Sequence, residues 1–311
     1  MLASFAEAVL ADPATTELVI VLDGPDDDAD RRGHVLAQRD PRVVLVTVEH
    51  CGQFGALDVG VHRATSEIIL LADDDVVFGP SLVTGHARHH ARRRGLVVLG
   101  SMPVETGTSD GHIGTVLYGR EYDSHCQAIE RGERTVLEGL WGGNFSVRRS
   151  DCLRVGVRSD DFPMHYHADQ DFGIRLGDAG LEGVYDPALA AVHRHGCDDE
   201  RFLRTARQQG ASLVVLHDVH ADRLGPFDRD GLVTDLPGPL RTVVVAVGGS
   251  TRANTGARAL LAVGTRLGPL MSRRIEIALA KLARRIMMWH GTTAGQGPPP
   301  PAAAPVAQRA A

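Results

Sequence analysis

Three consecutive carboxylates interrupt an apolar stretch of the sequence. The run IILLA ends at Asp73, Asp74 and Asp75, and apolar residues resume at Val76. Neighbouring like charges repel one another and cost stability. A divalent cation such as Mg²⁺ would offset that repulsion, because it takes one or two protein carboxylates together with phosphate oxygens of a substrate. The alternative is an acidic, solvated turn at the end of a strand.

The elements that must position these acids follow from the hydrophobic pattern. Continuous apolar runs predict strands at Leu18–Leu22, Arg42–His50 and Leu96–Ser101, with a further strand in SEIILLADDD. Continuous rather than alternating apolarity is typical of parallel strands that are buried on both faces. Segments with helical spacing separate these runs. We therefore expect an α/β fold with an open, mostly parallel, Rossmann-like sheet and helices on both faces.

The carboxyl ends of the strands form the usual ligand site of such a sheet. Asp23 ends the first predicted strand, and Asp73–Asp75 end a later one. The sequence therefore predicts that both groups face one ligand. For Asp23 the alternative is a plain turn, because Asp-Gly-Pro is favourable turn chemistry.

Composition limits the partners and the cell compartment. The 311-residue chain has a net charge of −6, which argues against nucleic acid as a partner. Its four cysteines are scattered without a CxxC pair, and the N-terminus lacks the basic start of a secretory signal. No run reaches the ~18 apolar residues of a spanning helix. We expect a cytoplasmic protein with reduced thiols.

Four motifs, in order, resemble those of the family 2 glycosyltransferases, which have the GT-A fold. The motifs are ELVIVLDGPDDDA, EHCGQFGALDVGVHRATSEIILLADDDV, GLWGGNFSVRRSD and HADQDFGIRLGDAGLEGVYDPALAAVHRH. The resemblance extends from residue 1 to about residue 215. Each motif is weak alone, and their order and spacing carry the resemblance.

The resemblance implies a role for each motif. The metal ligands would be Asp75 and Asp73, with His193 as a further metal or phosphate contact. Asp169 matches the general base, and Asp171 on the same predicted helix is the second candidate. The donor and its nucleotide would contact residues from three of the motifs, namely Asp23, Asp73, Asp74, Trp141, Gly142, Gly143 and Asn144.

The activity that the resemblance implies is transfer of a sugar to an acceptor hydroxyl with inversion, dependent on Mg²⁺ or Mn²⁺. The donor would be a UDP-, GDP- or dTDP-linked sugar, and the acceptor is not identified. The QxxRW signature of processive synthases is absent, so we expect transfer of single sugars. One alternative is a non-catalytic nucleotide-sugar-binding or scaffold protein, favoured by Ala168, where the family often has an acid. Another is a nucleotidyltransferase.

Two histidine-containing regions allow other interpretations. A zinc site is conceivable where two short clusters meet, although their spacing is not a standard zinc pattern; the clusters contain His165, His167, His193, His195 and Cys197. We expect HARHHARRRG, residues 86–95, to form a solvated helix face.

The expected domains are a GT-A domain at 1–218, a helical extension at 219–290 and a disordered Pro/Ala-rich tail at 291–311. A long helical segment, about Ala257–Trp289, combines apolar positions with a basic face that includes Arg274, Lys281 and Arg285. We expect this segment to dock on the catalytic domain. The alternative is peripheral contact with an anionic membrane.

The start of the sequence differs from the family. MLASFAEAVL is already a predicted helix, whereas members of the family begin with an apolar strand that lies inside the sheet. We expect that this strand is absent from the chain as given, and that the start codon lies upstream. The alternative is a weakened relative.

Extending the chain by the in-frame upstream codons should raise its melting temperature and strengthen donor binding. The added strand would pair backbone groups that otherwise cost about 1–3 kcal/mol each when buried. The expectation is wrong if the upstream DNA encodes no apolar strand, or if the extension changes neither quantity.

Overall fold

The computed structural model describes residues 2–105, 112–267 and 272–293. Its contacts divide these residues into two compact units. Unit 1 comprises the described residues of Met1–Pro103 and His125–Arg194, and unit 2 those of Val104–Ser124 and His195–Pro298. These boundaries differ from those of the predicted domains, because the helix that follows residue 198 belongs to unit 2. The predicted tail lies mostly outside the described residues.

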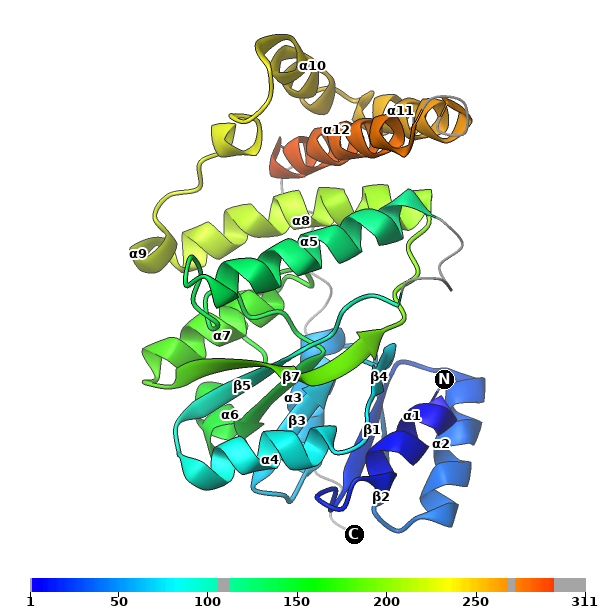
Figure 1. Ribbon diagram of the computed structural model, residues 1–311, viewed down its shortest axis with the longest axis vertical. Helices are drawn as coiled ribbons and strands as arrows, with labels where there is room; N and C mark the ends of the chain where they lie inside the picture. The colour runs from blue at the N-terminus through cyan, green and yellow to red at the C-terminus, as the bar shows by residue number, and fades with distance from the viewer. Residues whose placement is uncertain (1, 106–111, 268–271, 294–311) are drawn as a thin grey trace. The chain divides into compact units, whose positions relative to one another are not determined.

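The elements of unit 1 alternate between helix and strand for most of its length (Figure 1). In chain order they are α1 (Leu2–Ala11), β1 (Leu18–Asp23), α2 (Asp27–Arg39), β2 (Val43–Val48), α3 (Gln53–Arg63), β3 (Ile68–Ala72), β4 (Val76–Phe78), α4 (Leu82–Arg92), β5 (Leu96–Ser101), β6 (Asn144–Arg148), α6 (Arg149–Val155), α7 (Ala168–Asp178) and β7 (Glu182–His193). Helix α5 (Ile113–Glu130) contributes residues to both units.

The strands form two sheets, a parallel pair and a five-stranded sheet of mixed direction. One contains β1 and β2, and the other has the order β3-β6-β5-β7-β4. The pairs β1–β2 and β5–β7 are parallel, whereas β3–β6, β5–β6 and β4–β7 are antiparallel. The expectation of a mostly parallel sheet was therefore wrong. Apolarity along a strand reports burial on both faces and does not report the direction of its neighbour.

Strands β1 and β3 are edge strands in the described part of the chain. Only Ile20 of β1 is buried, although the apolar run predicted burial on both faces. Glu17 joins the amino ends of the two edges, because its carboxylate accepts the N–H groups of Thr65 and Ser66 at 2.7 and 2.5 Å.

The five-stranded sheet is covered on both faces, as expected. One face packs on an apolar cluster that includes Val61 of α3, Cys152 of α6 and Phe172 of α7, together with Phe145 and Val147 of β6. Helix α4 lies on the other face, against β3, β5 and β7 (Figure 1). The two-residue period of β6 therefore turns its polar residues toward α4.

This polar interface corrects the expected solvated helix. His86 and His90, one helical turn apart on α4, are each only 1% exposed. They lie against fully buried Ser146 and Asn144 of β6. A helix face rich in His and Arg is normally solvated, but here the polar residues of β6 provide partners that make burial of the two imidazoles tolerable.

The protons of this cluster can be assigned from its donors and acceptors. Asn144 donates its amide to the carbonyls of Ser101 and Leu189, at 3.0 and 2.9 Å. Its Oδ1 therefore accepts Nε2–H of His86, at 3.0 Å. Burial lowers the pKa of His86 to about 4, so Nδ1 of the neutral ring accepts the Ser146 hydroxyl at 2.8 Å. The Ser146 oxygen in turn accepts Nε2–H of His90, also at 2.8 Å.

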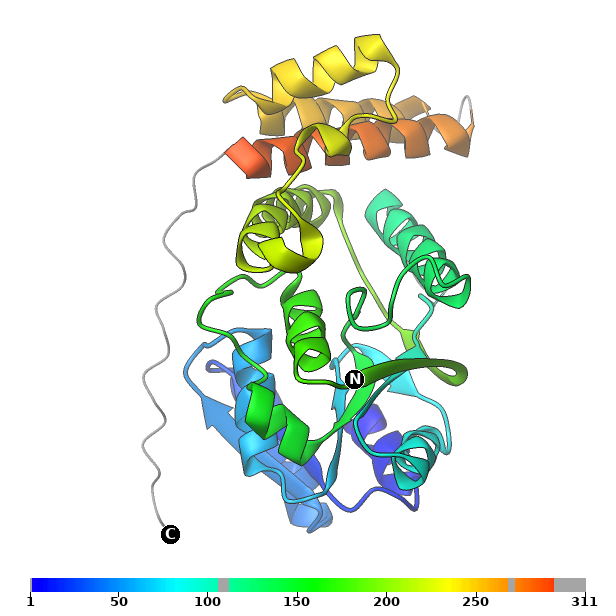
Figure 2. The same cartoon turned by 90° about the vertical axis from the view of Figure 1, so that its left-hand side faces the viewer.

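Unit 2 is helical. Besides the first part of α5 it contains α8 (Asp199–Val219), α9 (Ala221–Leu224), η1 (Asp230–Leu232), α10 (Gly238–Gly248), α11 (Ala253–Leu267) and α12 (Arg273–Thr293). Figure 2 shows α10, α11 and α12 side by side, and α12 packs on α8 as well. None of the helices in the described part is long and apolar enough to cross a membrane.

Helix α12 is docked within this unit. Its buried face includes Ala283, Ile286 and Trp289. Two of its basic residues are also engaged, because Arg284 pairs with Glu121 at 2.7 Å and Arg285 with Asp235 at 3.0 Å. The structure therefore favours the docked helix over a membrane-bound α12, and Met271 of the predicted segment lies outside the described residues.

The buried histidines should make the folded state acid-sensitive. Burial, with a smaller effect of Arg148, lowers the pKa of His90 from 6.5 to about 4. Between pH 6.5 and 4 the unfolded chain therefore binds the extra proton and the folded chain does not, so this contribution to stability is lost as the pH falls. Substitution His90→Gln keeps a donor for Ser146 but does not titrate.

The stability advantage of wild type over His90→Gln should therefore shrink by up to about 3 kcal/mol from pH 6.5 to pH 4. Urea unfolding at several pH values measures this difference, and acids common to both proteins cancel in it. An advantage that is constant across this range would contradict the burial of a neutral His90.

Candidate active site

Asp73 is the most constrained acid of the predicted cluster. It follows β3 directly, and its Oδ1 accepts the side-chain amide of Gln53 at 2.6 Å. Burial raises its pKa to about 6, and the charges of Asp75 and Asp169 act in the same direction, while His193 and Gln53 oppose them. Three carboxylates thus lie close enough to disfavour the ionisation of one of them.

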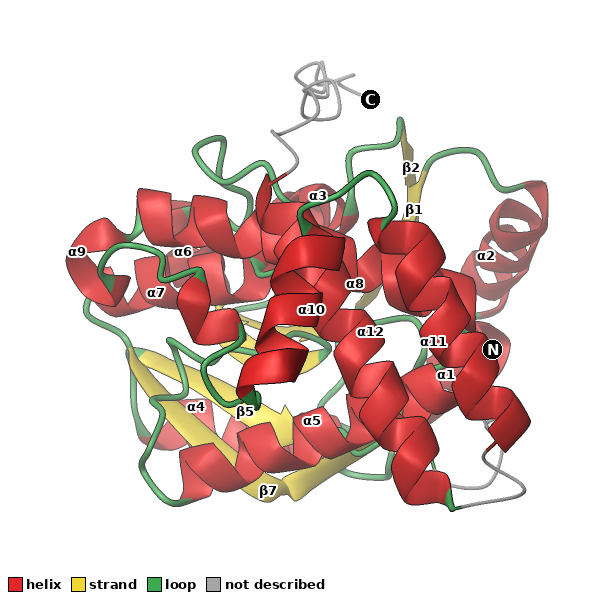
Figure 3. Ribbon diagram, turned by 90° about the horizontal axis from the view of Figure 1, so that it is seen from above, coloured by secondary structure: helices red, strands yellow, loops and turns green. Residues whose placement is uncertain are grey.

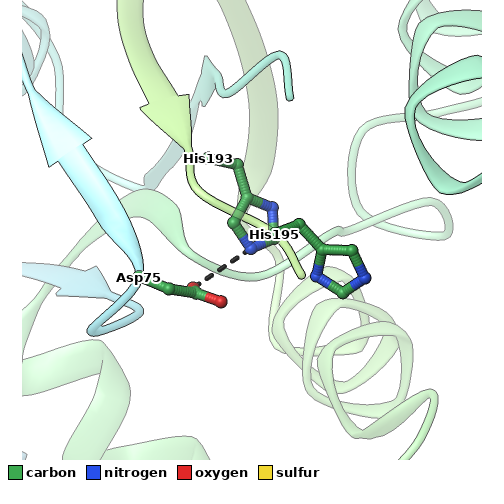
Figure 4. Close-up of side chains that lie close together, drawn as sticks. All are labelled: Asp75, His193 and His195. Atoms are coloured by element: carbon green, nitrogen blue, oxygen red, sulfur yellow. Dashed lines mark ion pairs between the residues drawn. The ribbon is translucent and has the colours of Figure 1, made fainter. Parts of the chain in front are cut away.

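Asp75 is paired with a buried histidine. Its Oδ1 lies 3.0 Å from Nε2 of His193, and its backbone carbonyl accepts the N–H of Arg194 at 2.8 Å. The pairing follows from the antiparallel register of β4 and β7, which sets Val76 opposite His193. Figure 4 draws the two side chains, together with His195, the first residue of unit 2. The exposed Asp74 lies between the two constrained acids in the sequence.

Asp169 occupies the first turn of α7, as predicted. One of its oxygens accepts the N–H of Gly142 at 2.9 Å, and the other accepts the N–H of Gln170 at 3.0 Å. Burial raises its pKa above the usual range for a carboxyl, against the effect of these two hydrogen bonds. A positioned carboxyl with a raised pKa is suited to accept a proton.

Gly143 brings the loop before β6 against Asp73. Its φ of +107° favours glycine, and its carbonyl accepts the Asp73 N–H at 3.4 Å. A Cβ at this position would lie 2.9 Å from Oδ2 of Asp73 and 2.8 Å from the sulfur of Met102. The predicted need for glycine is therefore met by a contact within the protein, and Gly142 next to it holds Asp169.

The burial and hydrogen bonds of Asn144 favour a supporting role over the predicted contact with the donor. The residue is fully buried, and its amide holds the carbonyls of Ser101 and Leu189 as described above. A Cβ on Gly100 would lie only 2.4 Å from the Asn144 amide nitrogen. Asn144 thus anchors the loop that carries Gly142 and Gly143.

Asp171 is held in a buried ion pair. It is 2% exposed, and its Oδ2 accepts Nε–H of Arg175 at 2.9 Å. Arg175 also donates to the backbone carbonyls of Val155 and Val157, at 3.1 and 2.9 Å. These contacts tie α7 to the segment after α6, so the geometry favours a structural role for Asp171 over its predicted catalytic role.

Asp23 closes the loop that leads into α3. Its two carboxylate oxygens accept the N–H groups of Cys51 and Gly52, at 2.6 and 3.0 Å, and the exposed His50 lies 3.1 Å away. Asp23 therefore fixes a loop that is distant in sequence, which the alternative of a local Asp-Gly-Pro turn does not account for. Each carboxylate oxygen has a second lone pair, so contact with a ligand is still compatible with these hydrogen bonds.

Trp141 is half-buried and lies beside His125. Their ring centroids are 5.1 Å apart in an edge-to-face arrangement. The indole immediately precedes the two glycines that contact Asp169 and Asp73. Its place next to this loop is consistent with the predicted pocket wall.

The residues predicted to bind a divalent cation lie near one another. Asp75 and His193 pair at 3.0 Å, and Asp73 lies close enough for the charges of both to act on it. Carboxylates with an imidazole are a combination that suits Mn²⁺. A cation beside Asp73 would favour its charged form, which burial and, to a smaller degree, the charges of Asp75 and Asp169 disfavour. The zinc alternative stays untested by these contacts.

Two supporting features were missed from the sequence. Gln53, the first residue of α3, was not singled out, although an amide after a glycine loop is a plausible partner for an acid. The role of His86 and Ser146 beneath Asn144 was missed because an isolated histidine-rich helix looks like a solvated one.

Comparison with known proteins adds family information. The profile of the family described as "Glycosyl transferase family 2" matches residues 1–155. No curated protein matches the chain significantly in sequence.

Two solved structures are similar over much of the chain. The mannosyltransferase PcManGT from Pyrobaculum calidifontis, in complex with GDP-Man and Mn²⁺, has a TM-score of 0.59 and 16% identity over 95% of this chain and 84% of that chain. GalNAc-T7 with UDP, GalNAc and Mn²⁺ has a TM-score of 0.51 and 11% identity over 73% and 47% of the two chains. These likenesses confirm the predicted GT-A-type α/β fold.

Substitution Gly143→Ala should disturb Asp73 in particular. The added methyl group meets the Asp73 carboxylate, and the positive φ adds a strain of about 1–3 kcal/mol. We expect a loss of stability in urea and a smaller rise in melting temperature on addition of Mn²⁺.

The matched control is Gly95→Ala, where φ is +69° and no atom lies within 4 Å of the added Cβ. It should show the backbone strain alone and keep the full response to Mn²⁺. Equal responses of the two variants to Mn²⁺ would show that the loop does not position Asp73.

Proposed function

Because the chain belongs to glycosyltransferase family 2, we propose that it transfers a single sugar from a nucleotide-sugar donor to an acceptor hydroxyl, with inversion and with a divalent metal ion. The observation that carries this proposal is the convergence of Asp73, Asp75 and Asp169 around the loop of Gly142 and Gly143. A cluster of carboxylates with raised pKa values marks a functional site more often than a structural one.

Asp75, His193 and Asp73 are the residues that would hold the metal. When bound, Mg²⁺ or Mn²⁺ would supply positive charge for the diphosphate leaving group. Within the protein, two of the acids have partners of their own. His193 pairs with Asp75, and Gln53 donates to Asp73. Both partners are fixed by strand register or by a helix start, so the acids have defined positions before any ligand binds.

Asp169 is the proposed general base. Its hydrogen bonds to the Gly142 and Gln170 N–H groups fix the carboxylate, and each oxygen keeps a lone pair with which to accept the acceptor hydroxyl's proton. Its raised pKa brings the group closer to the operating pH, which makes it a stronger base than an ordinary Asp. Protonation would occur on this carboxyl as the hydroxyl attacks the sugar.

The donor class follows from chemistry that the similar structures share. PcManGT was solved with GDP-Man and GalNAc-T7 with UDP, both with Mn²⁺. These ligands support a nucleoside diphosphate sugar for this chain without selecting its base, and dTDP-sugars remain in the set. Asp23, Asp74 and Trp141 are proposed to contact the nucleotide or the sugar, and the acceptor stays unidentified.

The second candidate is a protein of this family that binds the donor without turning it over. The buried Ala168 at the start of α7 favours it, because an acid is frequent there in the family. A nucleotidyltransferase is the third candidate. Release of free nucleoside diphosphate indicates a transferase, release of pyrophosphate a nucleotidyltransferase, and retention of intact donor a binding protein.

Substitution Asp169→Asn should slow release of nucleoside diphosphate by roughly two to four orders of magnitude with little change in donor affinity. UDP-, GDP- and dTDP-sugars with Mn²⁺ provide the donors for this assay. Asp178→Asn, an exposed position on the same helix, is the control and should keep wild-type rates.

Asp171→Asn should act differently, because it leaves Arg175 without its buried partner. Loss of one member of such a pair costs about 3–5 kcal/mol of stability. We expect a large drop in melting temperature and normal turnover by the protein that remains folded. A stable, inactive Asp171→Asn beside an active Asp169→Asn would mean that the base is Asp171.

A further inference from the structure

Helices α10 and α11 share a composition that differs from the rest of the chain. From Gly238 to Arg274 the sequence contains no Asp or Glu, whereas the whole chain has 39 acids against 33 Lys and Arg. The same stretch contains six arginines: Arg241, Arg252, Arg258, Arg266, Arg273 and Arg274. This part of unit 2 is therefore strongly positive within a protein of negative net charge.

The outer surfaces of these helices are also apolar. Val243, Val245 and Leu240 of α10 are 43, 39 and 40% exposed, and Val263 of α11 is 42% exposed. These four make up half of the large apolar side chains that are exposed in the described part of the chain. A surface helix normally turns charged or polar residues outward, so α10 departs from the usual pattern.

The exposed valines do not belong to the helix faces that pack in the core of unit 2. Helix α10 already buries Val244 and Gly248, and α11 buries Ala257 and Leu261 in the core of unit 2. Figure 3 shows α10 and α11 beside α12, which both of them contact. The exposed apolar residues therefore lie on the sides of these helices that the core does not use.

The arginines are available to an outside partner. Arg252 and Arg266 are exposed and form no ion pair with other described residues, and Arg258 pairs only with the exposed Glu200. An exposed pair of this kind contributes little stability and is readily exchanged for another anion. Arg284 and Arg285, further along α12, differ because they are already paired with acids of unit 2.

We propose that the outer surface of α10 and α11 binds an anionic lipid bilayer. The exposed valines and Leu240 would enter the boundary between headgroups and acyl chains, and the arginines would contact lipid phosphates. An anionic bilayer would contact both the exposed apolar side chains and the arginines. A zwitterionic bilayer would not attract the arginines, and a soluble polyanion would not bind the valines. The proposal does not depend on the proposed sugar transfer.

Sedimentation of the full chain with lipid vesicles tests the proposal. The protein should pellet with vesicles that contain phosphatidylglycerol, pellet poorly with phosphatidylcholine alone, and detach as salt is raised. Val243→Asp should weaken binding to anionic vesicles at least about tenfold, and Arg266→Glu at least about fivefold, the effect of one basic residue near such a surface.

Two control variants in unit 1 match these changes. Val35 on α2 is 43% exposed, the same fraction as Val243, so Val35→Asp controls for an added exposed charge. Arg39→Glu controls for charge reversal at an exposed arginine. Both controls should bind vesicles like wild type, and melting temperatures show that all four variants are folded.

Three results would overturn the proposal. One is absence of binding to anionic vesicles, and another is an equal loss of binding in the unit 1 controls. The third is concentration-dependent self-association without lipid that Val243→Asp abolishes, which would make a second copy of the chain the occupant.

Discussion

The mutual repulsion of three carboxylates is the constraint on which this site depends. Asp73, Asp75 and Asp169 are close enough that burial and neighbouring charge raise the pKa of Asp73 to about 6. The protein limits this cost with one neutral donor, Gln53, and one imidazole, His193. Gln53 and His193 offset only part of the repulsion between the acids. A bound cation would offset the rest, so such an arrangement suits a metal site. Burial and mutual repulsion therefore distinguish these acids from a solvated acidic turn and favour a functional site.

The acids keep their positions because a polar layer lies under the loop that contacts them. His90, Ser146 and His86 form a directed hydrogen-bond chain that ends on Asn144, the residue after Gly143. Asn144 is fixed further by two backbone carbonyls of the neighbouring strands. Each hydrogen bond of this chain rigidifies its surroundings, whereas Nδ1 of His90 at its far end is buried without a hydrogen-bond partner. The interface of α4 and β6 thus positions the site without touching a ligand.

Much of this could be predicted from the sequence, because it depends on local patterns. The strands around Asp23 and Asp73, the helix of Asp169 and the α/β class all follow from apolar runs and turn residues. Strand direction could not be predicted, because an apolar run indicates burial whether the neighbouring strand is parallel or antiparallel. The burial of His86 and His90 was missed because their partners, Ser146 and Asn144, are distant in sequence. Asp171 was the second candidate for the base, and the sequence did not reveal that Arg175, one turn later, holds it in an ion pair.

Binding of nucleoside diphosphates measured by calorimetry tests the central claim most directly, namely that these acids form a metal-dependent donor site. Wild type should bind UDP, GDP or dTDP in the presence of Mn²⁺ and lose that affinity when the metal is removed. At a hundred times the dissociation constant such a ligand should add about 2.7 kcal/mol of stability. Asp75→Asn should abolish the metal-dependent part while the protein stays folded. Mn²⁺-dependent affinity that is unchanged in Asp75→Asn would contradict the account.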